Sequence, residues 1–301
     1  MEALEAAECP VVIEPEPPGR WRWTGTTTCQ FEPDHRFPMA TEYRVSIAAG
    51  TRSALGNVLE EAFGFEFATP APKWTRRYPR RTTVQTLQPR LFLGFNQFVD
   101  REAILGQTRV TVGGEAVGGD LVLIDEGAVG DDAVLGPLAK AQRGRGGPRT
   151  WVAVGLSEDL PVDARVVVTV GPEVAGAEGP RTAPELSFKF RTYPPLRLQE
   201  KYPTGASHPN GSWSLVFTNP IEAATFSRDL IRVEPPIEFE VMAEAGSASV
   251  RLSPASEAGT RYTVTVDEAL ADIHGQTLTG RRTATFKVKK EYAPVNGLVF
   301  L

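Results

Sequence analysis

The sequence predicts an all-β protein made of tandem β-sandwich domains, and three observations lead to this prediction. Alternation of apolar and polar residues, the pattern of half-buried strands, dominates the chain, while helical periodicity is nearly absent. Gly (28 residues) and Pro (25 residues) are abundant, which is typical of many turns between short strands. A sequence motif of two segments, which we call a phrase, also recurs three times along the chain. The length of 301 residues suits two or three sandwiches of roughly 100 residues each.

Each copy of the phrase has an alternating strand rich in valine, then a glycine-bearing turn and a strand with phenylalanine that runs into proline. The strand parts are TEYRVSIAAG from Thr41, DARVVVTVGP from Asp163 and GTRYTVTVDEA from Gly259. The second parts are LGNVLEEAFGFEFATPAP from Leu55, ELSFKFRTYPP from Glu185 and IHGQTLTGRRTATFKVKKEYAP from Ile273. Repetition on this scale indicates an array of like domains, and such arrays commonly act as spacers, scaffolds or binding surfaces.

The alternation predicts strands in all three parts of the chain. They are expected at Arg20–Thr24, Thr28–Glu32, Tyr43–Ala48, Phe63–Thr69, Leu91–Phe95, Arg109–Val112, Asp120–Ile124, Thr150–Leu156, Arg165–Val170, Leu186–Thr192, Ser212–Thr218, Ile231–Glu234, Ile237–Ala243, Ala248–Leu252, Arg261–Asp267 and Thr283–Val288. Short helical turns are expected at Asp100–Leu105, Asp131–Ala141, Ala223–Ser227 and Glu268–Asp272. The second of these contains Pro137, which limits it to a turn or two.

Proline clusters at Thr69–Arg81 and Tyr193–Pro203 predict connectors between domains. The expected domains are a partial one at 1–72, a sandwich at 73–195 and a sandwich at 196–301. The middle domain is expected to carry a mobile surface loop at Glu126–Pro148. The first copy lacks the apolar opening strand found in the other two, so we expect a truncated sandwich with an uncovered face.

Composition and charge exclude several classes of protein. A net charge of −5 argues against a general nucleic-acid binder, which needs a basic surface. No apolar run is long enough to span a bilayer, and the acidic start MEALEAAECPVV is not a signal peptide. The two cysteines, Cys9 and Cys29, are too few for a disulfide framework. Cys29 lies two residues before Phe31, so both side chains share one strand face, and Cys29 is expected to point into a core. The sequence leaves open whether Cys29 pairs with Cys9.

No catalytic, cofactor-binding or metal-binding residue is predicted. The sequence has no Gly-x-Ser-x-Gly elbow, no His-Glu-x-x-His pair and no phosphate loop. The histidines His35, His208 and His274 are far apart in the sequence and all lie in turn-like contexts.

Three further groups of residues have both a functional and a structural interpretation. An acidic group could surround calcium, although it lacks the ligand order of a known loop motif, and a solvated acidic surface is the alternative; it comprises Asp120, Asp125, Glu126, Asp131 and Asp132. A basic group in the first connector could contact an anionic partner or an acidic face of a neighbouring domain, or it could remain solvated; it comprises Arg76, Arg77, Arg80 and Arg81. Trp21 and Trp23 share one strand face, where core packing is the default and an exposed stacking platform is the alternative.

Several segments of the sequence resemble segments of one protein family. GRWRWTGTTTCQFEPDHRFPMATEYRVSIAAGTRSALGNVL resembles the first bacterial immunoglobulin-like domain near the start of bacterial alpha-2-macroglobulin-type proteins. FLGFNQFVDREAIL and AEGPRTAPELSFKFRTYPPLRL resemble the opening and close of the next domain, and WSLVFTNPIEAATF resembles the start of the third. The similarity extends from about Gly19 to Pro294. It implies tandem immunoglobulin-like β-sandwiches, the first truncated.

Members of that family are envelope proteins that trap proteases with a bait region and, often, an internal thioester. This chain lacks the Cys-Gly/Leu-Glu-Gln type of motif, because Cys9 precedes Pro-Val-Val and Cys29 precedes Gln-Phe-Glu. The stretch LQEKYPTGASHPNGSW also lacks the cysteines that relatives carry near the start of the third domain. The resemblance therefore implies a non-catalytic N-terminal scaffold in the periplasm or cell envelope, whose partners are the rest of the protein and, indirectly, target proteases.

Two other functions remain open at this point. One is a surface adhesin or binding array, favoured by an exposed patch that the repeats share. The other is an enzyme, which would need a nucleophile, a base and an orienting group in one pocket. The target protease and the oligomeric state are not determined by the sequence.

Overall fold

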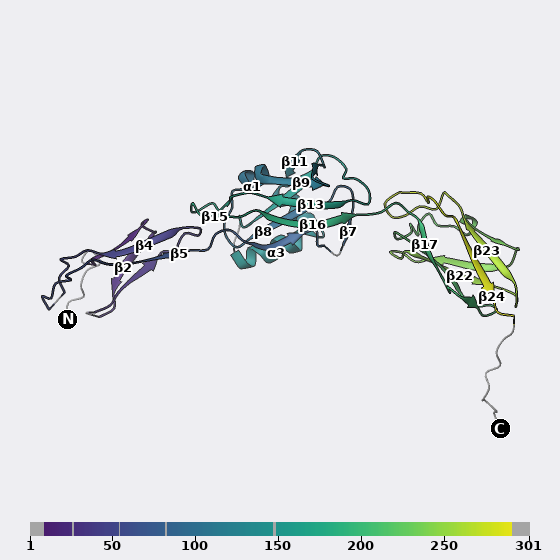
Figure 1. Cartoon of the computed structure of the whole chain (residues 1–301), viewed down its shortest axis with the longest axis horizontal. Helices are drawn as coiled ribbons and strands as arrows, with labels where there is room; N and C mark the ends of the chain where they lie inside the picture. Colours follow the sequence, from purple (N-terminus) through teal and green to yellow (C-terminus); the bar gives the residue numbers. More distant parts are fainter. Residues whose placement is uncertain (1–8, 26, 54, 82, 147–148, 291–301) are drawn as a thin grey trace, which may run out of the picture. The chain divides into compact units, whose positions relative to one another are not determined.

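The computed structural model describes residues 9–25, 27–53, 55–81, 83–146 and 149–290. It is built mainly of strands, which confirms the all-β class (Figure 1). The chain divides into two compact units, one of Met1–Leu160 with Arg165–Phe190 and one of Pro161–Ala164 with Arg191–Leu301. Every strand predicted from the alternation is present, with bounds that differ by at most two residues.

The N-terminal part of the first unit holds two small sheets. A three-stranded sheet has the order β1-β4-β5, and a hairpin pairs β2 with β3. These strands are β1 (Val11–Glu14), β2 (Gly19–Trp23), β3 (Cys29–Pro33), β4 (Glu42–Ile47) and β5 (Phe63–Ala68). Strand β1 was missed by the sequence analysis, because its run of only three apolar residues lies among prolines and glutamates.

The N-terminal sheets enclose a small core. Ile13, Tyr43 and Val45 are its buried members, and Trp21 and Phe31 from the hairpin pack against them. Trp21 contacts Phe31 edge to face, with ring centroids 5.2 Å apart. Core packing is therefore the correct interpretation of Trp21.

The hairpin covers the inner face of the N-terminal three-stranded sheet only in part. Pairing of Val45 with Phe65 and of Ile47 with Phe63 puts these four side chains on the same face of the sheet. Val45 is only 8% exposed, yet Phe63 and Phe65 on the edge strand β5 are 58% and 52% exposed. Apolar side chains of this face are therefore exposed along the edge strand β5, and the truncation of this sandwich stays a prediction.

The rest of the first unit is a sandwich of two larger sheets. One has the order β10-β9-β13-β16-β7 and the other β11-β12-β8-β6, with a small β14-β15 hairpin beside them. The strands are β6 (Trp74–Tyr78), β7 (Val84–Gln85), β8 (Leu91–Phe95), β9 (Thr108–Val112), β10 (Glu115–Ala116), β11 (Leu121–Leu123), β12 (Trp151–Leu156), β13 (Arg165–Val170), β14 (Val174–Ala175), β15 (Thr182–Ala183) and β16 (Leu186–Thr192).

The predicted loop at Glu126–Pro148 is wrong over the residues that the structure describes. This stretch forms α2 (Glu126–Asp131) and α3 (Leu135–Gly146), which follow the shorter α1 (Arg101–Gln107). Pro137 falls in the first turn of α3, where the missing N–H costs no intrahelical bond, so the helix continues for 12 residues. Residues 147 and 148 lie outside the described residues.

Helices α2 and α3 cover the outer face of the β11-β12-β8-β6 sheet, and Figure 1 shows α3 beside β8. Val129, Leu135 and Ala139 are buried there against Phe92 and Trp151. All five residues of β8 are buried as a result, since one face meets the sandwich core and the other meets the helices.

The second unit is a sandwich of two four-stranded sheets. Their orders are β17-β19-β22-β21 and β18-β24-β23-β20, with β18 parallel to β24. The elements are β17 (Leu198–Tyr202), β18 (Ala206–Ser207), β19 (Trp213–Phe217), the 3₁₀ turn η2 (Arg228–Leu230), β20 (Ile231–Glu234), β21 (Phe239–Ala243), β22 (Ser249–Pro254), β23 (Arg261–Val266) and β24 (Thr283–Val288). The expected helical turns at Ala223–Ser227 and Glu268–Asp272 are non-helical turns.

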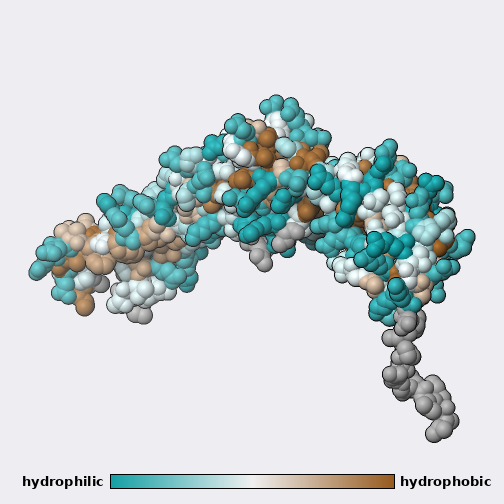
Figure 2. Space-filling view, turned by 45° about the vertical axis from the view of Figure 1, so that its right-hand side comes forward, coloured by the Kyte–Doolittle hydropathy of each residue, from teal (hydrophilic) through white to brown (hydrophobic). Residues whose placement is uncertain are grey.

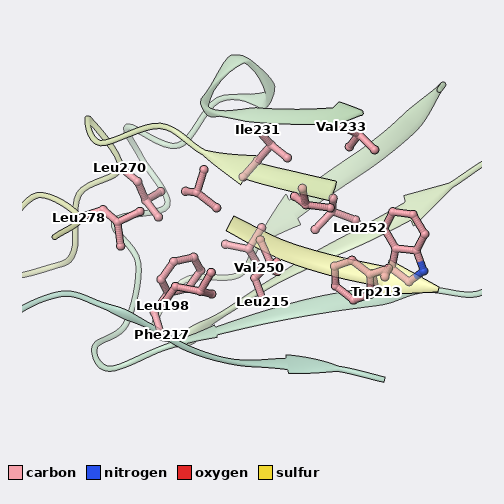
Figure 3. Close-up of a cluster of buried hydrophobic side chains, with 14 of the residues drawn as sticks. Leu198, Trp213, Leu215, Phe217, Ile231, Val233, Val250, Leu252, Leu270 and Leu278 are labelled. Carbon is pink, nitrogen blue, oxygen red and sulfur yellow. The ribbon is translucent and has the colours of Figure 1, made fainter. Parts of the chain in front are cut away.

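Apolar side chains of both sheets meet in the core of this second unit (Figure 3). Trp213 stacks on Phe286 with ring centroids 4.5 Å apart and donates its indole N–H to Ser207 Oγ. The core has 18 buried apolar residues among those described, whereas the N-terminal core has three. Burial of apolar area drives folding, so the N-terminal sheets have much the smaller driving force.

Both predicted connectors contain a strand. Trp74–Tyr78 of the first connector is β6, the edge strand paired with β8, and Leu198–Tyr202 of the second is β17, paired with β19. The prolines that suggested linkers flank these strands rather than interrupt them. Proline is tolerated at the ends of edge strands, where no ladder hydrogen bond is lost.

Candidate functional site

The three histidines occupy separate structural settings. His35 is exposed after β3, and His208 follows β18 with Nε2 3.1 Å from Lys289 Nζ. His274 stacks on Tyr193, with ring centroids 4.0 Å apart. Within the described ranges, no group of three or more His, Cys, Asp or Glu residues could hold a metal ion.

Members of the acidic group have structural contacts of their own. Asp125 caps α2 by accepting from the backbone N–H groups of Gly127 and Ala128. Glu126 pairs with Arg143 at 3.0 Å. Asp125 and Glu126 therefore serve the helical layer, and calcium binding is not needed to explain their position.

Asp132 caps α3 in the same way. Its Oδ1 accepts from the backbone N–H groups of Val134 at 2.8 Å and Leu135 at 2.7 Å, and its Oδ2 pairs with Arg90. Burial by itself would raise the pKa of this carboxyl, but the two amide donors and the Arg90 guanidinium together hold the pKa below its ordinary value.

The basic group lies on a strand and not on a free connector. Arg76 and Arg77 belong to β6, and Arg80 and Arg81 follow it. With Trp74 and Thr75 they line a groove of about 450 Å³. Among the residues that the structure describes, no acidic side chain pairs with any of the four guanidinium groups. This arginine groove is a surface that can attract anions.

A buried cluster of hydrogen-bonded polar groups lies at the entry to the second unit. Asn219 Nδ2 donates to the carbonyl oxygen of Pro194 at 2.8 Å and to Asp272 Oδ2 at 2.7 Å. Gln276 Nε2 donates to the same two acceptors at 3.0 and 2.9 Å. Asp272 Oδ1 accepts from the backbone N–H groups of His274 and Gln276. We call this cluster of Pro194, Asn219, Asp272 and Gln276 the entry tether.

The entry tether fixes the segment that leads into the sandwich. Asn219 is 2% exposed and Asp272 1%, so their polar atoms depend on these internal partners. Four donors surround the Asp272 carboxylate, which offsets the cost of burying its charge. Thr218 adds a further bond by donating to the carbonyl oxygen of Pro195 at 2.7 Å.

A corresponding asparagine performs the same task in the preceding sandwich. Asn96 follows β8 as Asn219 follows β19, and its Oδ1 accepts from the backbone N–H of Lys73 at 2.8 Å. Its Nδ2 donates to the carbonyl oxygen of Ala71. In both sandwiches, therefore, an asparagine after the opening apolar strand binds the chain segment that enters that sandwich.

In LFLGFNQF and WSLVFTNP an asparagine follows an apolar strand, but neither segment shows which groups that asparagine binds. Asp272 was assigned only to a helical turn, although DIHGQ has the form of an Asx turn in which the aspartate bonds the backbone downstream. That pattern could have marked Asp272 as a structural residue. The contact with Pro194 joins residues too far apart in the sequence for any local pattern to show.

Segments 34–42 and 176–182 also meet within the first unit. Glu178 pairs with Arg36 at 2.8 Å and accepts from the backbone N–H of Met39. Arg181 donates to the carbonyl oxygen of Thr69 and lies 3.4 Å from Glu42. The β14-β15 loop thus contacts the N-terminal strands through charged side chains.

The exposed phenylalanines of β5 are the other notable surface. Figure 2 shows apolar colour along the N-terminal strands, at the left of the view. Phe63 and Phe65 are the exposed aromatic residues there, and their ring centroids are 6.5 Å apart. The repeats do not share this patch, because the corresponding Phe188, Phe190 and Phe286 are buried in their sandwiches.

Both cysteines are free thiols, and both are half-buried. Cys29 stands at the start of β3, and Cys9 lies two residues before β1. Burial, with a smaller contribution from Cys9, raises the pKa of the Cys29 thiol to about 12.

These features define tandem β-sandwiches of the immunoglobulin-like class with structural polar clusters at their entries. Residues 195–288 match the family described as bacterial Ig-like domain, which covers the sandwich of the second unit. No curated protein matches the chain.

Solved structures with partial similarity include three multi-domain chains. The N-terminal part of the bacterial S-layer protein SbsC is 13% identical, covers 73% of this chain and has a TM-score of 0.24. LD transpeptidase LdtMt1 in complex with imipenem is 12% identical, with 73% of this chain and 100% of that chain covered and a TM-score of 0.25. The I-band fragment I67–I69 from titin is 9% identical, with 93% and 88% covered and a TM-score of 0.25. The match spans 44% of the S-layer structure, and superpositions this loose support no conclusion about function.

None of the helices in the described part of the chain has both the length and the apolar character needed to cross a membrane.

Proposed function

We propose that this chain is a non-catalytic N-terminal scaffold segment of an alpha-2-macroglobulin-like, protease-trapping protein of the periplasm or cell envelope. The bacterial Ig-like match at 195–288 supports the immunoglobulin-like part of this proposal. The assignment to alpha-2-macroglobulin-like proteins depends on the segments between about Gly19 and Pro294 that resemble that family. The partners would be the remaining domains of the full-length protein and, through them, the target proteases.

The observation that carries the scaffold role is the asparagine found at the entry of two successive sandwiches. Asn96 holds Ala71 and Lys73, and Asn219 holds Pro194. A segment bound to the domain that it enters has fewer free backbone torsions than a flexible linker. Repeating this device in an array suits a protein that must position other domains.

An antibody raised against this chain provides the test. It should detect an envelope protein longer than 301 residues, and that protein should reduce the activity of trypsin toward casein. The isolated chain should leave this activity unchanged at equimolar concentration. Stoichiometric inhibition by the isolated chain, or a longer protein that never inhibits, would contradict the proposal.

The alternative function is a surface adhesin or binding array, and the arginine groove on β6 favours it. Four guanidinium groups without acidic partners among the described residues would attract an anionic glycan. Heparin, used as a model anionic glycan, should then bind the chain with an affinity that falls as salt rises.

Charge reversal separates the two functions. The double substitution Arg80→Glu and Arg81→Glu should weaken heparin binding if the groove is the site. The matched control is Arg20→Glu with Arg22→Glu, because those arginines already pair with Glu32. Equal losses in the two variants would indicate attraction by overall charge rather than a site.

A further inference from the structure

Strand β5 has a free edge, because β4 is its only hydrogen-bonded neighbour among the strands that the structure describes. The corresponding strands of the next two sandwiches, β16 and β24, each have a neighbour on both sides. Strand β16 lies between β13 and the short strand β7, and β24 lies between β23 and the short strand β18. A strand that joins β5 would therefore give the N-terminal sheet the arrangement that both later sandwiches have.

The backbone groups of Gly64 and Glu66 point to this free edge. In an antiparallel pair, the positions that bond the neighbouring strand alternate along the chain. The backbone N–H of Thr69 donates to the carbonyl oxygen of Thr41, and the same alternation makes Phe65 bond β4. The N–H and C=O groups of the residues between these positions consequently face away from β4. A row of such groups on an exposed strand is a template for a further strand.

The two faces of β5 restrict which strand fits. Phe63 and Phe65 are more than half exposed on one face, so a partner with aromatic side chains there would cover apolar area. On the other face, the Glu66 carboxylate lies 2.7 Å from the Arg44 guanidinium. The partner strand must therefore place neither a second carboxylate nor a bulky apolar group opposite Glu66.

Strand β5 of a second copy of this chain meets both conditions. Its sequence FGFEF has a phenylalanine two residues before and two residues after Phe65. When two copies run antiparallel with Phe65 opposite Phe65, each Phe63 faces Phe67 of the other copy. Each Glu66 then faces Gly64, which has no side chain, and these two residues form the hydrogen-bonded pair that their backbone directions require. A slide of two residues either way would leave one phenylalanine of each copy without an aromatic partner, and one of these slides would place the two Glu66 carboxylates opposite each other.

We propose that β5 is a dimerisation strand, which pairs antiparallel with β5 of a second copy and joins the two three-stranded N-terminal sheets into one continuous sheet. The twofold axis passes beside Phe65, so both copies use the same surface. The interface is one strand wide on each side, below the roughly 800 Å² per partner of a standard interface, and the dimer is therefore weak. The pairing is independent of any role in protease trapping.

Sedimentation equilibrium of the reduced full chain tests the pairing, at concentrations from about 10 µM to about 1 mM because an interface of this size is weak. The average mass should rise from monomer to dimer, without larger species. Glu66→Pro removes a backbone N–H that faces the free edge and none that bonds β4, so it should weaken the dimer at least about 10-fold. The matched control Glu66→Ala loses the same side chain, keeps the N–H and should dimerise as the wild type does. A chain that stays monomeric, larger assemblies, or equal dimerisation of the two variants would overturn the proposal.

Opposite charges at position 65 test the register. Phe65→Lys and Phe65→Glu should each remain monomeric, because like charges would face each other across the axis, whereas an equimolar mixture of the two should form a mixed dimer. In the wild type, hydrogen exchange in β5 should slow as the concentration rises, while exchange in β23 stays unchanged. A mixture that remains monomeric, or protection that rises outside β5 instead, would contradict pairing through Phe65.

Discussion

Substitution of Asn219 by alanine should weaken the sandwich of the second unit more than the same change at Asn96. Asn219 Nδ2 lies 2.7 Å from the carboxylate of Asp272, and both residues are almost fully buried. The substitution removes one hydrogen bond to a charged acceptor and one to the carbonyl of Pro194. A bond to a charged group contributes about 1.5–3 kcal/mol and a neutral one about 0.5–1 kcal/mol, so we expect a loss of about 2–4 kcal/mol.

Asn96→Ala is the matched control. Asn96 is only half-buried, and its partners are the neutral backbone groups of Lys73 and Ala71, the second at 3.4 Å. Its loss should cost about 1 kcal/mol. The difference between the two variants therefore measures the contribution of the buried carboxylate.

Hydrogen exchange with mass spectrometry can measure both effects in the same chain. Asn219→Ala should reduce protection in β19 and β23 by about 30-fold to 1000-fold, and leave β8 and β12 unchanged. In an Asp272→Asn background, the effect of Asn219→Ala should fall to about 1–2 kcal/mol, because a neutral acceptor replaces the charged one. If Asn219→Ala costs no more than Asn96→Ala, or if its effect is the same in the two backgrounds, the argument from the buried charge is refuted.

Three further predictions concern the first unit. Asp132→Asn should lower the free energy of unfolding at neutral pH by about 1 kcal/mol in urea denaturation. Because the pKa of Asp132 is lowered in the folded state, its contribution is present above the ordinary carboxyl pKa of about 4 and is lost as the pH falls through the folded value. The stabilities of wild type and variant should therefore converge in acid. Gly94→Ala would place a Cβ 3.0 Å from Gln142 Oε1. This overpacking should destabilise the contact between α3 and β8 by about 1–3 kcal/mol in thermal unfolding. An unchanged stability would mean that the helix shifts freely. The reduced chain should show lower hydrogen-exchange protection in β1–β5 than in β23, and equal protection would show that three buried residues suffice for a stable N-terminal sandwich.

Gln142 illustrates why the helical layer could not be predicted. Its Nε2 donates to the carbonyl oxygen of Phe95 at 2.6 Å, and its Oε1 accepts from Thr75, so α3 is fixed by residues from two distant strands. The stretch around it is rich in glycine and contains Pro137, which favoured a loop. The continuous apolar runs LFLGF and WVAVGL were the available sign of this helical layer. A strand that is apolar on both faces is buried on both, so it needs a covering layer on each side of its sheet.

The sequence by itself determined the strands and the repeating sandwich class. Alternation is a local property, because successive side chains of a strand point to opposite faces, and it therefore located segments such as Arg165–Val170 and Arg261–Val266 correctly. These features depend on neighbours in the chain.

Only the tertiary structure decided which polar groups meet. Asn219 reaches Pro194 and Asp272, and Gln142 reaches Phe95, each across a separation that no local pattern encodes. Prolines that suggested linkers flank edge strands, because an edge strand needs partners on one side only. The physical reason is the same in each case: burial makes a polar group depend on one particular partner, and folding alone brings that partner into reach.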